Sequence, residues 1–335
     1  MNDAKKIVIT GGAGFIGSHL AERLLKSGES EIVIFDSFRH GDNNNLDEIS
    51  NNSRITLVNG DIRNQEQVEE LLNDDVDMVY HLSSIVGIEH YCKDPLEVID
   101  VNVLGTRYVA EMALKNNFRV LYASTSEVFG RNPKIPWSEN DDRVLGSSTV
   151  DRWSYSSSKS LCEHMLFALA KHQDLQCSIV RFFNVYGPRQ NPIFVVSRGI
   201  HRVLNNKSPV VYDSGEQNRC FTFIEDAIEG MLLAADSDEA IGEAFNIGSN
   251  TPTTIREIND LILKLGDPTG KMTLESIDTS ELYGSRYEDI GLRVPDNSKA
   301  AEILGWHPTT TVSDGIESTI SWAKNNPDWL SLEVD

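Results

Sequence analysis

Residues 7–17 read Ile-Val-Ile-Thr-Gly-Gly-Ala-Gly-Phe-Ile-Gly, an apolar run that leads directly into a glycine-rich turn. Gly11 can make the tight turn, Gly14 lets the backbone approach a pyrophosphate, and Gly17 lets a following helix pack close to a sheet. The N-terminus of such a helix favours phosphate groups. The stretch therefore predicts a strand, a glycine turn and a helix that together bind a dinucleotide.

A second apolar run, residues 31–35, ends at Asp36. An acid here can accept hydrogen bonds from the adenosine ribose diol and would repel a 2′-phosphate, so NAD is favoured over NADP. Arg39 and His40 lie close enough in the sequence to weaken that preference. The alternative is a glycine-rich turn that binds no ligand. The strand before the turn and the acid after the second run argue against this alternative.

The composition limits the classes of protein to consider. With 335 residues, 40% of them hydrophobic, the chain can bury a substantial core and suggests one large or two closely joined domains. A formal net charge of −21 argues against a nucleic-acid or anionic-membrane surface, since both need a basic footprint. An anionic substrate would therefore have to meet a local cluster of arginines inside a cleft.

The sequence shows neither a cleavable signal nor an apolar run long enough to span a bilayer, so we expect a cytoplasmic protein without a membrane partner. Cys92, Cys162, Cys177 and Cys220 show no paired metal-ligand spacing, and cytosolic thiols stay reduced. We interpret most of them as buried core residues and assign no metal.

Runs typical of β-strands alternate with amphipathic stretches along the first half of the chain. The β-type runs continue at residues 55–58, 78–82 and 119–124, with helical stretches near 65–73 and 97–116. This order predicts an α/β fold with a Rossmann-type, doubly wound parallel sheet. Functional side chains should gather at the carboxyl ends of its strands. The polar residues found there are Asp61, Ser83, Ser84, Ser124, Thr125 and Glu127.

After about residue 185 the pattern loosens into shorter segments with more proline and glycine. We therefore predict an NAD-binding Rossmann domain over residues 1–185 and a smaller nucleotide-sugar-binding lobe mainly over residues 186–335. We also expect the chain to cross back to the first domain, so the boundary is not sharp.

The segment Tyr155-Ser-Ser-Ser-Lys159 carries the clearest chemical signal. Tyr and Lys four residues apart share one face of a helix, so the Lys159 ammonium can lower the pKa of the Tyr155 phenol and hold the nicotinamide ribose. Such a phenol can remove a proton from a sugar hydroxyl while NAD accepts the carbon-bound hydride. The spacing alone would also suit a solvated surface pair, but after a dinucleotide motif it indicates catalysis.

These motifs resemble the extended short-chain dehydrogenase/reductase family, whose members modify nucleotide-linked sugars. The resemblance spans nearly the whole chain, and besides the motifs above it rests on residues 60–62, 81–84, 124–127 and 181–189. It implies a bound NAD that is reduced and reoxidised within one turnover, with Asp61 and Ile62 flanking the adenine. The residues expected at the cofactor are Gly11, Gly14, Phe15, Ile16, Gly17, Asp36, Asp61, Ile62, Leu82, Ser83, Ser84, Asn102, Ser124, Tyr155 and Lys159.

The same resemblance implies where a UDP-sugar would bind. Thr125 would hydrogen-bond the sugar beside Tyr155, and Asn184 and Arg219 would contact the diphosphate. The residues expected at the substrate are Ser126, Arg152, Asn184, Arg219 and Arg293.

Glu127 is the main guide to the reaction within this family. Simple 4-epimerases usually carry a small residue here, 4,6-dehydratases use the carboxylate to take the C5 proton, and glucuronate decarboxylases carry it near the sugar ring. Dehydratases of the dTDP series typically place Asp before this Glu, whereas this chain has Ser126, which weakens that interpretation.

Residues 283–289 and 292–296 look like the C-terminal part of UDP-glucuronate decarboxylases, and Arg152-Trp153 also fits that group. The resemblance implies that Arg293 lies beside the glucuronate, where a guanidinium can hold a carboxylate and stabilise charge on the C4 oxygen. A structural ion pair in the C-terminal lobe is the alternative for Arg293. The residues predicted to be catalytic are Thr125, Glu127, Tyr155, Lys159 and Arg293.

The leading prediction is a UDP-glucuronate decarboxylase. Tyr155 would deprotonate the C4 hydroxyl, the hydride would pass to NAD, and the resulting β-keto acid would lose its C6 carboxylate. The product is a UDP-4-keto-pentose or, after hydride return, UDP-xylose. A UDP-sugar or UDP-uronate 4-epimerase is the first alternative, because Arg293 could hold a carboxylate without expelling it, and a 4,6-dehydratase is the second. A non-catalytic NAD sensor would not require the Tyr155–Lys159 pair.

Other conspicuous residues have simpler interpretations. His81 ends a core strand and is expected to be a packed structural histidine. Residues 85–92 either line the sugar pocket or pack as a loop. The amphipathic helices near residues 97–116 and 156–171 could pair across a two-fold axis, as they do in this family, which predicts a homodimer.

Overall fold

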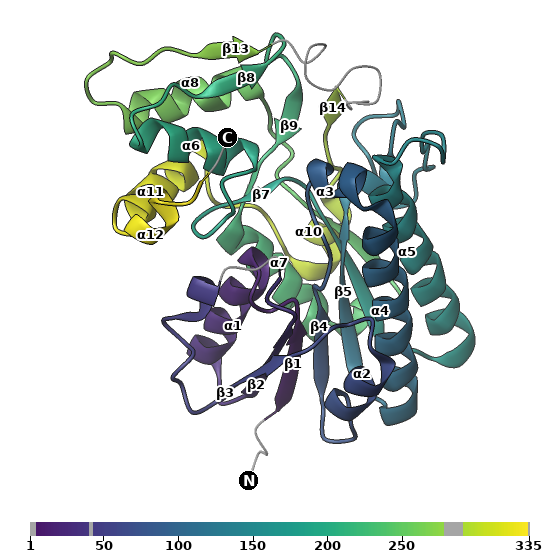
Figure 1. Ribbon diagram of the computed structural model, residues 1–335. Helices are drawn as coiled ribbons and strands as arrows, with labels where there is room; N and C mark the ends of the chain where they lie inside the picture. The colour runs from purple at the N-terminus through teal and green to yellow at the C-terminus, as the bar shows by residue number, and fades with distance from the viewer. Residues whose placement is uncertain (1–4, 40–42, 278–290, 334–335) are drawn as a thin grey trace.

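The computed structural model describes residues 5–39, 43–277 and 291–333. Within these ranges the central element is a parallel sheet with the strand order β11-β6-β5-β4-β1-β2-β3 (Figure 1). Its strands are β1 (Lys6–Thr10), β2 (Glu31–Asp36), β3 (Ile55–Asn59), β4 (Met78–His81), β5 (Arg119–Thr125), β6 (Cys177–Phe182) and β11 (Ala244–Ile247). The predicted Rossmann-type sheet is confirmed.

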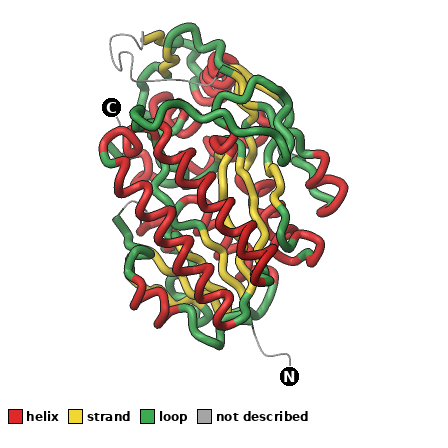
Figure 2. The backbone as a smooth tube through the Cα atoms, turned by 90° about the vertical axis from the view of Figure 1, so that its right-hand side faces the viewer, coloured by secondary structure: helices red, strands yellow, loops and turns green. Residues whose placement is uncertain are grey.

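Helices cover both faces of this sheet (Figures 1 and 2). On one face α1 (Phe15–Ser27) packs against α7 (Ile224–Asp236), and on the other α4 (Pro95–Asn116) lies along α5 (Trp153–Gln173). Successive side chains of a strand point to opposite faces. Ile7 and Ile9 therefore join the core beneath α1 and α7, whereas Val8 joins the core beneath α4 and α5. Burial on both faces explains why the strands read as continuous apolar runs.

The chain leaves the sheet after β6 and returns to it at β11, beside which α7 and α10 pack. Between and after these points, α6, α8 and α11 pack together with three small sheets, paired β7–β10, β8–β13 and β12–β9–β14. The strands are β7 (Val185–Tyr186), β8 (Val210–Tyr212), β9 (Asn218–Cys220), β10 (Thr222–Phe223), β12 (Pro252–Thr254), β13 (Glu275–Ile277) and β14 (Leu292–Arg293). The remaining helices are α2 (Gln65–Leu71), α3 (Ile88–Lys93), α6 (Val195–Leu204), α8 (Ile255–Gly266), α10 (Ser298–Leu304), α11 (Val312–Lys324) and α12 (Pro327–Leu330), with the short 3-10 helices η1 (Asn43–Leu46), η2 (Ser126–Phe129) and η3 (Asp238–Ala240).

A small aromatic core supports the segment after β5. Phe129, Trp137, Trp153 and Phe183 are buried together there. The Trp137 backbone N–H donates to the Val294 carbonyl over 2.9 Å, which fixes the stretch around β14 to this core. The cluster therefore holds η2, the start of α5 and β14 close to one another.

Among the described residues, no helix is both long and apolar enough to cross a membrane. The same part of the chain contains no group of three or more His, Cys, Asp or Glu side chains that could hold a metal. Cys162, Cys177 and Cys220 are buried, as expected for most of the cysteines, and Cys92 is exposed.

Candidate active site

The glycine turn between β1 and α1 is closely packed. Gly11 has φ +71°, and a Cβ there would lie 2.8 Å from the Ser83 backbone nitrogen. A Cβ on Gly17 would lie 2.6 Å from the Gly11 carbonyl oxygen. Gly14 is the N-cap of α1 and gives it no side-chain cap, so the first N–H groups of the helix remain available to an anion. Phe15 and Ile16 form its first turn.

Asp36 is held beside this turn at the end of β2. Its Oδ2 accepts a hydrogen bond from Ala13 N over 3.0 Å, and its Oδ1 accepts one from Phe38 N over 2.9 Å. Arg39, expected to weaken the preference for NAD, lies 3.8 Å from Asp61 and 3.7 Å from Glu97. His40 lies outside the described residues. The turn, the open helix end and the fixed acid fit a dinucleotide.

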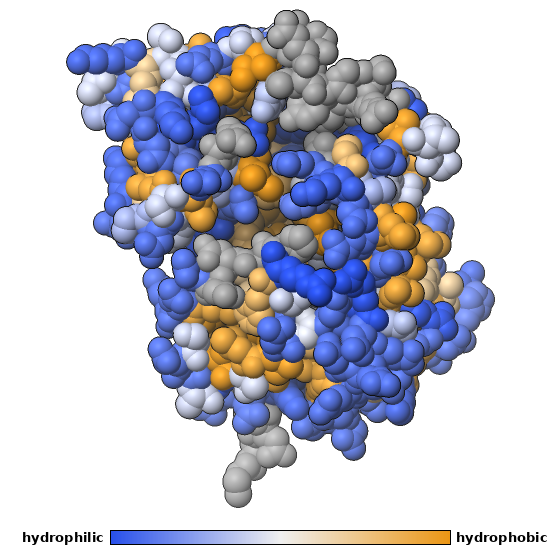
Figure 3. Space-filling model, in the orientation of Figure 1, coloured by the Kyte–Doolittle hydropathy of each residue, from blue (hydrophilic) through white to orange (hydrophobic). Residues whose placement is uncertain are grey.

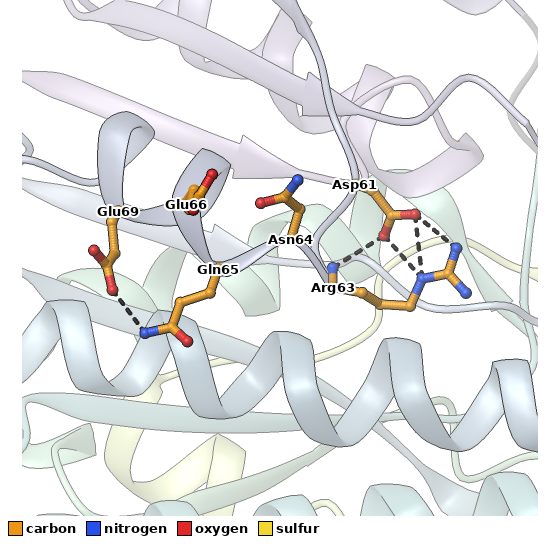
Figure 4. Close-up of a pocket in the computed structure, with 6 residues that line it drawn as sticks. All are labelled: Asp61, Arg63, Asn64, Gln65, Glu66 and Glu69. Carbon is orange, nitrogen blue, oxygen red and sulfur yellow. Dashed lines mark hydrogen bonds and ion pairs between the residues drawn. The ribbon is translucent and has the colours of Figure 1, made fainter.

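Asp61 borders an open depression of about 770 Å³ beside α2 (Figure 4). Arg63 holds its carboxylate through contacts of 2.6 and 3.0 Å, and this hydrogen bonding lowers the pKa of Asp61 despite partial burial. The depression is lined by Asp61, Arg63, Asn64, Gln65, Glu66 and Glu69. Ile62 is buried. It packs so closely on Gly105 of α4 that a Cβ on Gly105 would lie 2.8 Å from Ile62 Cγ1.

The loop after β4 is tied to the helix that carries Tyr155. Ser84 Oγ donates to Asn102 Oδ1 over 2.7 Å, and Asn102 Nδ2 donates to Ser158 Oγ over 3.0 Å. Leu82 N and Ser83 N donate to the carbonyl and hydroxyl of Thr10, respectively. These bonds connect four residues expected at the cofactor to Thr10 on β1 and to Ser158 on α5. The four are Leu82, Ser83, Ser84 and Asn102.

His81 is buried between two threonines, as expected for a structural histidine. Its Nδ1 lies 2.7 Å from Thr10 Oγ1 and its Nε2 lies 3.2 Å from Thr106 Oγ1. Burial, with a contribution from the charge of Lys159, lowers the pKa of His81 to about 3. The ring is therefore neutral at physiological pH and links β1 to α4.

Tyr155 and Lys159 both lie on α5 and are almost fully buried, with exposed fractions of 6% and 2%. The Lys159 ammonium donates to the Ala123 carbonyl over 2.8 Å and lies over the Tyr122 ring, 4.7 Å from its centroid. Tyr155 stacks on Tyr91, with ring centroids 4.6 Å apart and planes 6° from parallel. The helix therefore presents a rigid phenol at the carboxyl end of β5.

The expected lowering of the Tyr155 pKa is wrong for the protein by itself. Burial raises the pKa of Tyr155, the charge of Glu127 raises it further, and hydrogen bonding with Ser84, Thr125 and Tyr91 only partly offsets both effects. Burial also lowers the pKa of Lys159 to about 8. Desolvation thus dominates both groups, and the four-residue spacing does not reveal it.

Two arginines meet the Glu127 carboxylate. Arg152 Nη1 donates to Oε2 over 2.9 Å, and Arg293 Nη1 donates to Oε1 over 3.2 Å. Burial by itself would raise the pKa of Glu127, but the charges and hydrogen bonds of the arginines outweigh it and hold that pKa at about 2. Ser156 Oγ also donates to Oε2 over 3.3 Å. The structure therefore joins η2, the start of α5 and β14 through one ionised acid.

The remaining predicted residues lie around this group. Thr125 Oγ1 accepts from Glu127 N over 3.2 Å and caps η2, in which Ser126 is the first, buried residue. Arg219 on β9 pairs in register with Arg293 on β14. Asn184 Nδ2 donates to the Cys220 carbonyl over 3.4 Å, next to Arg219.

Ser124, expected at the cofactor, bonds to an acid on α5. Its Oγ donates to Glu163 Oε1 over 2.5 Å. The decarboxylase-like residues 283–289 lie outside the described residues.

Sequence reasoning missed several neighbours of this group. Tyr91 falls in the segment 85–92, for which pocket lining and loop packing were both open, and no spacing rule connects it to Tyr155. Ser156 lies inside the Tyr–Lys motif, but its contact with Glu127 depends on where η2 falls. Glu163, one turn beyond Lys159, would have been found by asking which acid follows the motif at the same four-residue interval.

A Rossmann sheet with a phosphate-binding turn, an acid after β2 and a Tyr–Lys pair on α5 defines an extended short-chain dehydrogenase/reductase. More specifically, the chain belongs to the GDP-mannose 4,6 dehydratase family, whose model matches residues 8–319.

Individual relatives differ in reaction. The chain is 37% identical to UDP-N-acetyl-alpha-D-glucosaminuronate decarboxylase of Bacillus cytotoxicus over 95% of this chain and 97% of the relative. It is 32% identical to UDP-glucuronic acid decarboxylase 1 of Xenopus tropicalis, over 96% of this chain and 72% of the relative. A solved UDP-glucuronic acid 4-epimerase of Bacillus cereus, in complex with UDP-glucuronic acid and NAD, is 30% identical with a TM-score of 0.85, covering 96% of this chain and 99% of that one. The chain is thus a nucleotide-sugar dehydratase, decarboxylase or epimerase.

Proposed function

We propose that this protein is an NAD-dependent decarboxylase of a UDP-linked uronic acid, either UDP-glucuronate or its 2-acetamido counterpart. The observation that carries the proposal is the pair of arginines that converge on Glu127 beside Tyr155. In a chain with a net charge of −21, this is the local cationic cluster that a uronate carboxylate needs. The names of the two decarboxylase relatives support the same substrate class.

The cofactor residues act by holding NAD in place. The glycine turn and the N-terminus of α1 would bind its pyrophosphate, and Asp36 would accept hydrogen bonds from the adenosine ribose. Bound there, NAD would supply the acceptor for the hydride of sugar C4 and the donor that returns it. Lys159 would hold the nicotinamide ribose from α5.

Tyr155 starts the reaction by removing the proton of the C4 hydroxyl as C4 loses its hydride. The product is a ketone at C4, placed β to the C6 carboxylate. When the C5–C6 bond breaks, carbon dioxide leaves and its bonding electrons pass through C5 to the C4 oxygen. Arg293 would hold the carboxylate before this step and stabilise the enolate oxygen during it. A proton then adds to C5 and gives the 4-keto-pentose.

Glu127 acts in this scheme as an anion and not as an acid. A carboxyl with a pKa of about 2 is ionised at physiological pH, so it has no proton to donate to C5. Its position between Arg152 and Arg293 instead suits it to orient both guanidinium groups. A UDP-uronate 4-epimerase remains the second candidate, because the Bacillus cereus neighbour shares the fold over nearly the whole chain.

The deciding experiment is to incubate the purified protein with NAD and either UDP-glucuronate or UDP-N-acetylglucosaminuronate and to follow products by mass spectrometry and NMR. We expect loss of carbon dioxide from at least one of them. The amount of NADH formed shows whether the keto sugar is released or reduced again. A product of unchanged mass with inverted configuration at sugar C4 would identify the epimerase instead. No conversion of either uronate would refute the proposal.

We also infer a homodimer that pairs α4 and α5 across a two-fold axis. Exposed apolar side chains lie on both helices, and Figure 3 shows hydrophobic surface on the side where these helices run. These side chains are Leu96, Ile99, Leu104 and Leu161. Light scattering should give a dimer for the native protein, and the double change Leu96→Glu with Leu161→Glu should give a monomer. The matched control is Leu57→Glu on edge strand β3, which should stay dimeric; a monomeric native protein would refute the inference.

A further inference from the structure

Glu163 is a buried acid that the proposed reaction does not use. It lies on α5 one turn beyond Lys159 and two turns beyond Tyr155, so the three side chains follow one another along the same face of the helix. Its exposed fraction is 0%. A buried carboxylate is costly unless it is paired and hydrogen-bonded, so its partners indicate its purpose.

The partners of Glu163 come from three other segments. Oε1 accepts from Ser124 Oγ on β5 over 2.5 Å and from Arg181 Nε on β6 over 3.0 Å. Oε2 accepts from Arg181 Nη2 over 2.8 Å and from Arg143 Nη2. Burial by itself would raise the pKa of Glu163, but Arg181 and Arg143 outweigh it and lower that pKa. The group is therefore an ionised acid with both oxygens engaged.

The position of these contacts relates them to the chemistry. Lys159 binds the carbonyl of Ala123, and Glu163 binds the hydroxyl of the next residue, Ser124. Two successive turns of α5 are thus fastened to two successive residues of β5. The residue that follows, Thr125, caps the short helix in which Glu127 lies. These two attachments therefore act together with the Glu127–Arg152 contact in setting the spacing between the Tyr155 phenol and the Glu127 segment.

Stability alone does not call for such an arrangement. Replacing a buried ion pair by apolar side chains of similar volume is often neutral or stabilising, so a charged cluster in this position needs another reason. The surrounding core is apolar, with Leu166 and Cys162 on the same helix and Ile179 on β6. Apolar side chains could fill the space, but they would not hold Ser124 or offset the Lys159 ammonium.

We propose that Glu163 is a positioning residue for the Tyr155–Lys159 pair: it fastens α5 to the carboxyl end of β5 and supplies the counter-charge for the buried Lys159 ammonium. The role rests on the proposed C4 oxidation, in which Tyr155 and Lys159 act. Of the charged and titratable groups around Lys159, His81 faces it from β4 and Tyr122 from β5, while Cys162 and Glu163 share its helix. With His81 neutral, Glu163 is the ionised acid in this set, and Arg181 and Arg143 also pair with its carboxylate.

The first test measures Lys159 directly and needs no nucleotide sugar. The full-length protein is isotope-labelled at lysine Cε, the Lys159 NMR signal is assigned by its loss in Lys159→Arg, and its titration is followed. In Glu163→Gln the Lys159 pKa should fall by about one pH unit, because the charge of Glu163, which together with Cys162 opposes desolvation of Lys159, is lost. Glu163→Asp keeps the charge and should preserve the native titration. An unchanged titration in Glu163→Gln would overturn the proposal.

The second test separates the attachment from the charge. Ser124→Ala removes the hydroxyl bond to Glu163 and leaves the carboxylate in place, so kcat should fall by about tenfold with the Lys159 titration unchanged. The matched control is Ser178→Ala, a buried serine on the neighbouring β6 whose hydroxyl donates to the Ala234 carbonyl away from the site. A native kcat in Ser124→Ala would refute the attachment. If the Glu163→Gln protein does not fold, Ser124→Ala still tests the proposal. A native protein that converts no UDP-uronate would refute the proposed function alone, since the titration is measured without substrate.

Discussion

Tyr155→Phe should abolish C4 oxidation, with a loss of about 10³-fold in the rate of NADH formation from bound UDP-uronate, as expected when a positioned general base is removed. The phenolic oxygen is the one atom that changes. The ring remains, and with it the stacking on Tyr91 at 4.6 Å that holds the side chain in place. Binding of NAD should therefore stay within about threefold of the native value, because the contacts of the glycine turn and Asp36 are untouched.

The measurement is a single turnover with protein in excess over UDP-glucuronate, followed by NADH absorbance, with NAD binding measured separately by calorimetry. Tyr80→Phe is the matched control, since Tyr80 is also a buried tyrosine on the sheet but lies in the opposite core, beneath α1 and α7. It should react at the native rate. A Tyr155→Phe variant that forms NADH as fast as the native protein would refute the assignment of the base.

The Tyr–Lys pair shows which part of the site could be predicted from sequence. Spacing on a helix predicts which side chains share a face, and this placed Tyr155 and Lys159 together correctly. The direction of their pKa shifts depends on burial, which spacing does not contain. Burial of Lys159 is set by packing against Tyr122 and Ala123, residues that precede it by more than thirty positions. The free protein therefore raises the pKa of Tyr155, because burial favours the neutral phenol.

Strands could be predicted from the sequence where a short run of neighbouring residues carries the pattern. Residues 31–35 and 119–124 lie in parallel strands, because apolar runs between turn residues mark strands that are buried on both faces. Residues 55–58 also lie in a parallel strand, but it is the largely exposed edge strand β3. The strand β11 at the edge of the sheet was not identified, since its four residues carry no periodic signal and its pairing with β6 is a long-range contact. Glu127 is a second case in which contacts between distant positions could not be predicted from the sequence. Its importance was predicted, whereas its simultaneous contact with Arg152 and Arg293 joins positions up to 166 residues apart.

Arg293→Gln should weaken binding of UDP-glucuronate by about 10²-fold, the effect of losing a charge-assisted contact to a carboxylate. Binding of UDP-glucose, which has no carboxylate, should change less than about threefold. The comparison decides between the two roles considered for Arg293. A structural ion pair with Glu127 would affect both sugars equally, because its loss would disturb β14 and η2 whatever the substrate. Equal weakening of both sugars would therefore contradict the carboxylate-binding role.

Glu127→Gln provides the complementary test of the same contact. It breaks the ion pair from the other side and removes a negative charge that lies 3.2 Å from the Arg293 guanidinium. If Arg293 serves the uronate, this variant should bind UDP-glucuronate at least as tightly as the native protein, since the competing anion is gone. Decarboxylation should nevertheless slow, because Arg152 and Arg293 lose the acid that orients them. Weaker binding of UDP-glucuronate in both variants would mean instead that the ion pair itself builds the substrate site and that neither arginine acts on the carboxylate directly.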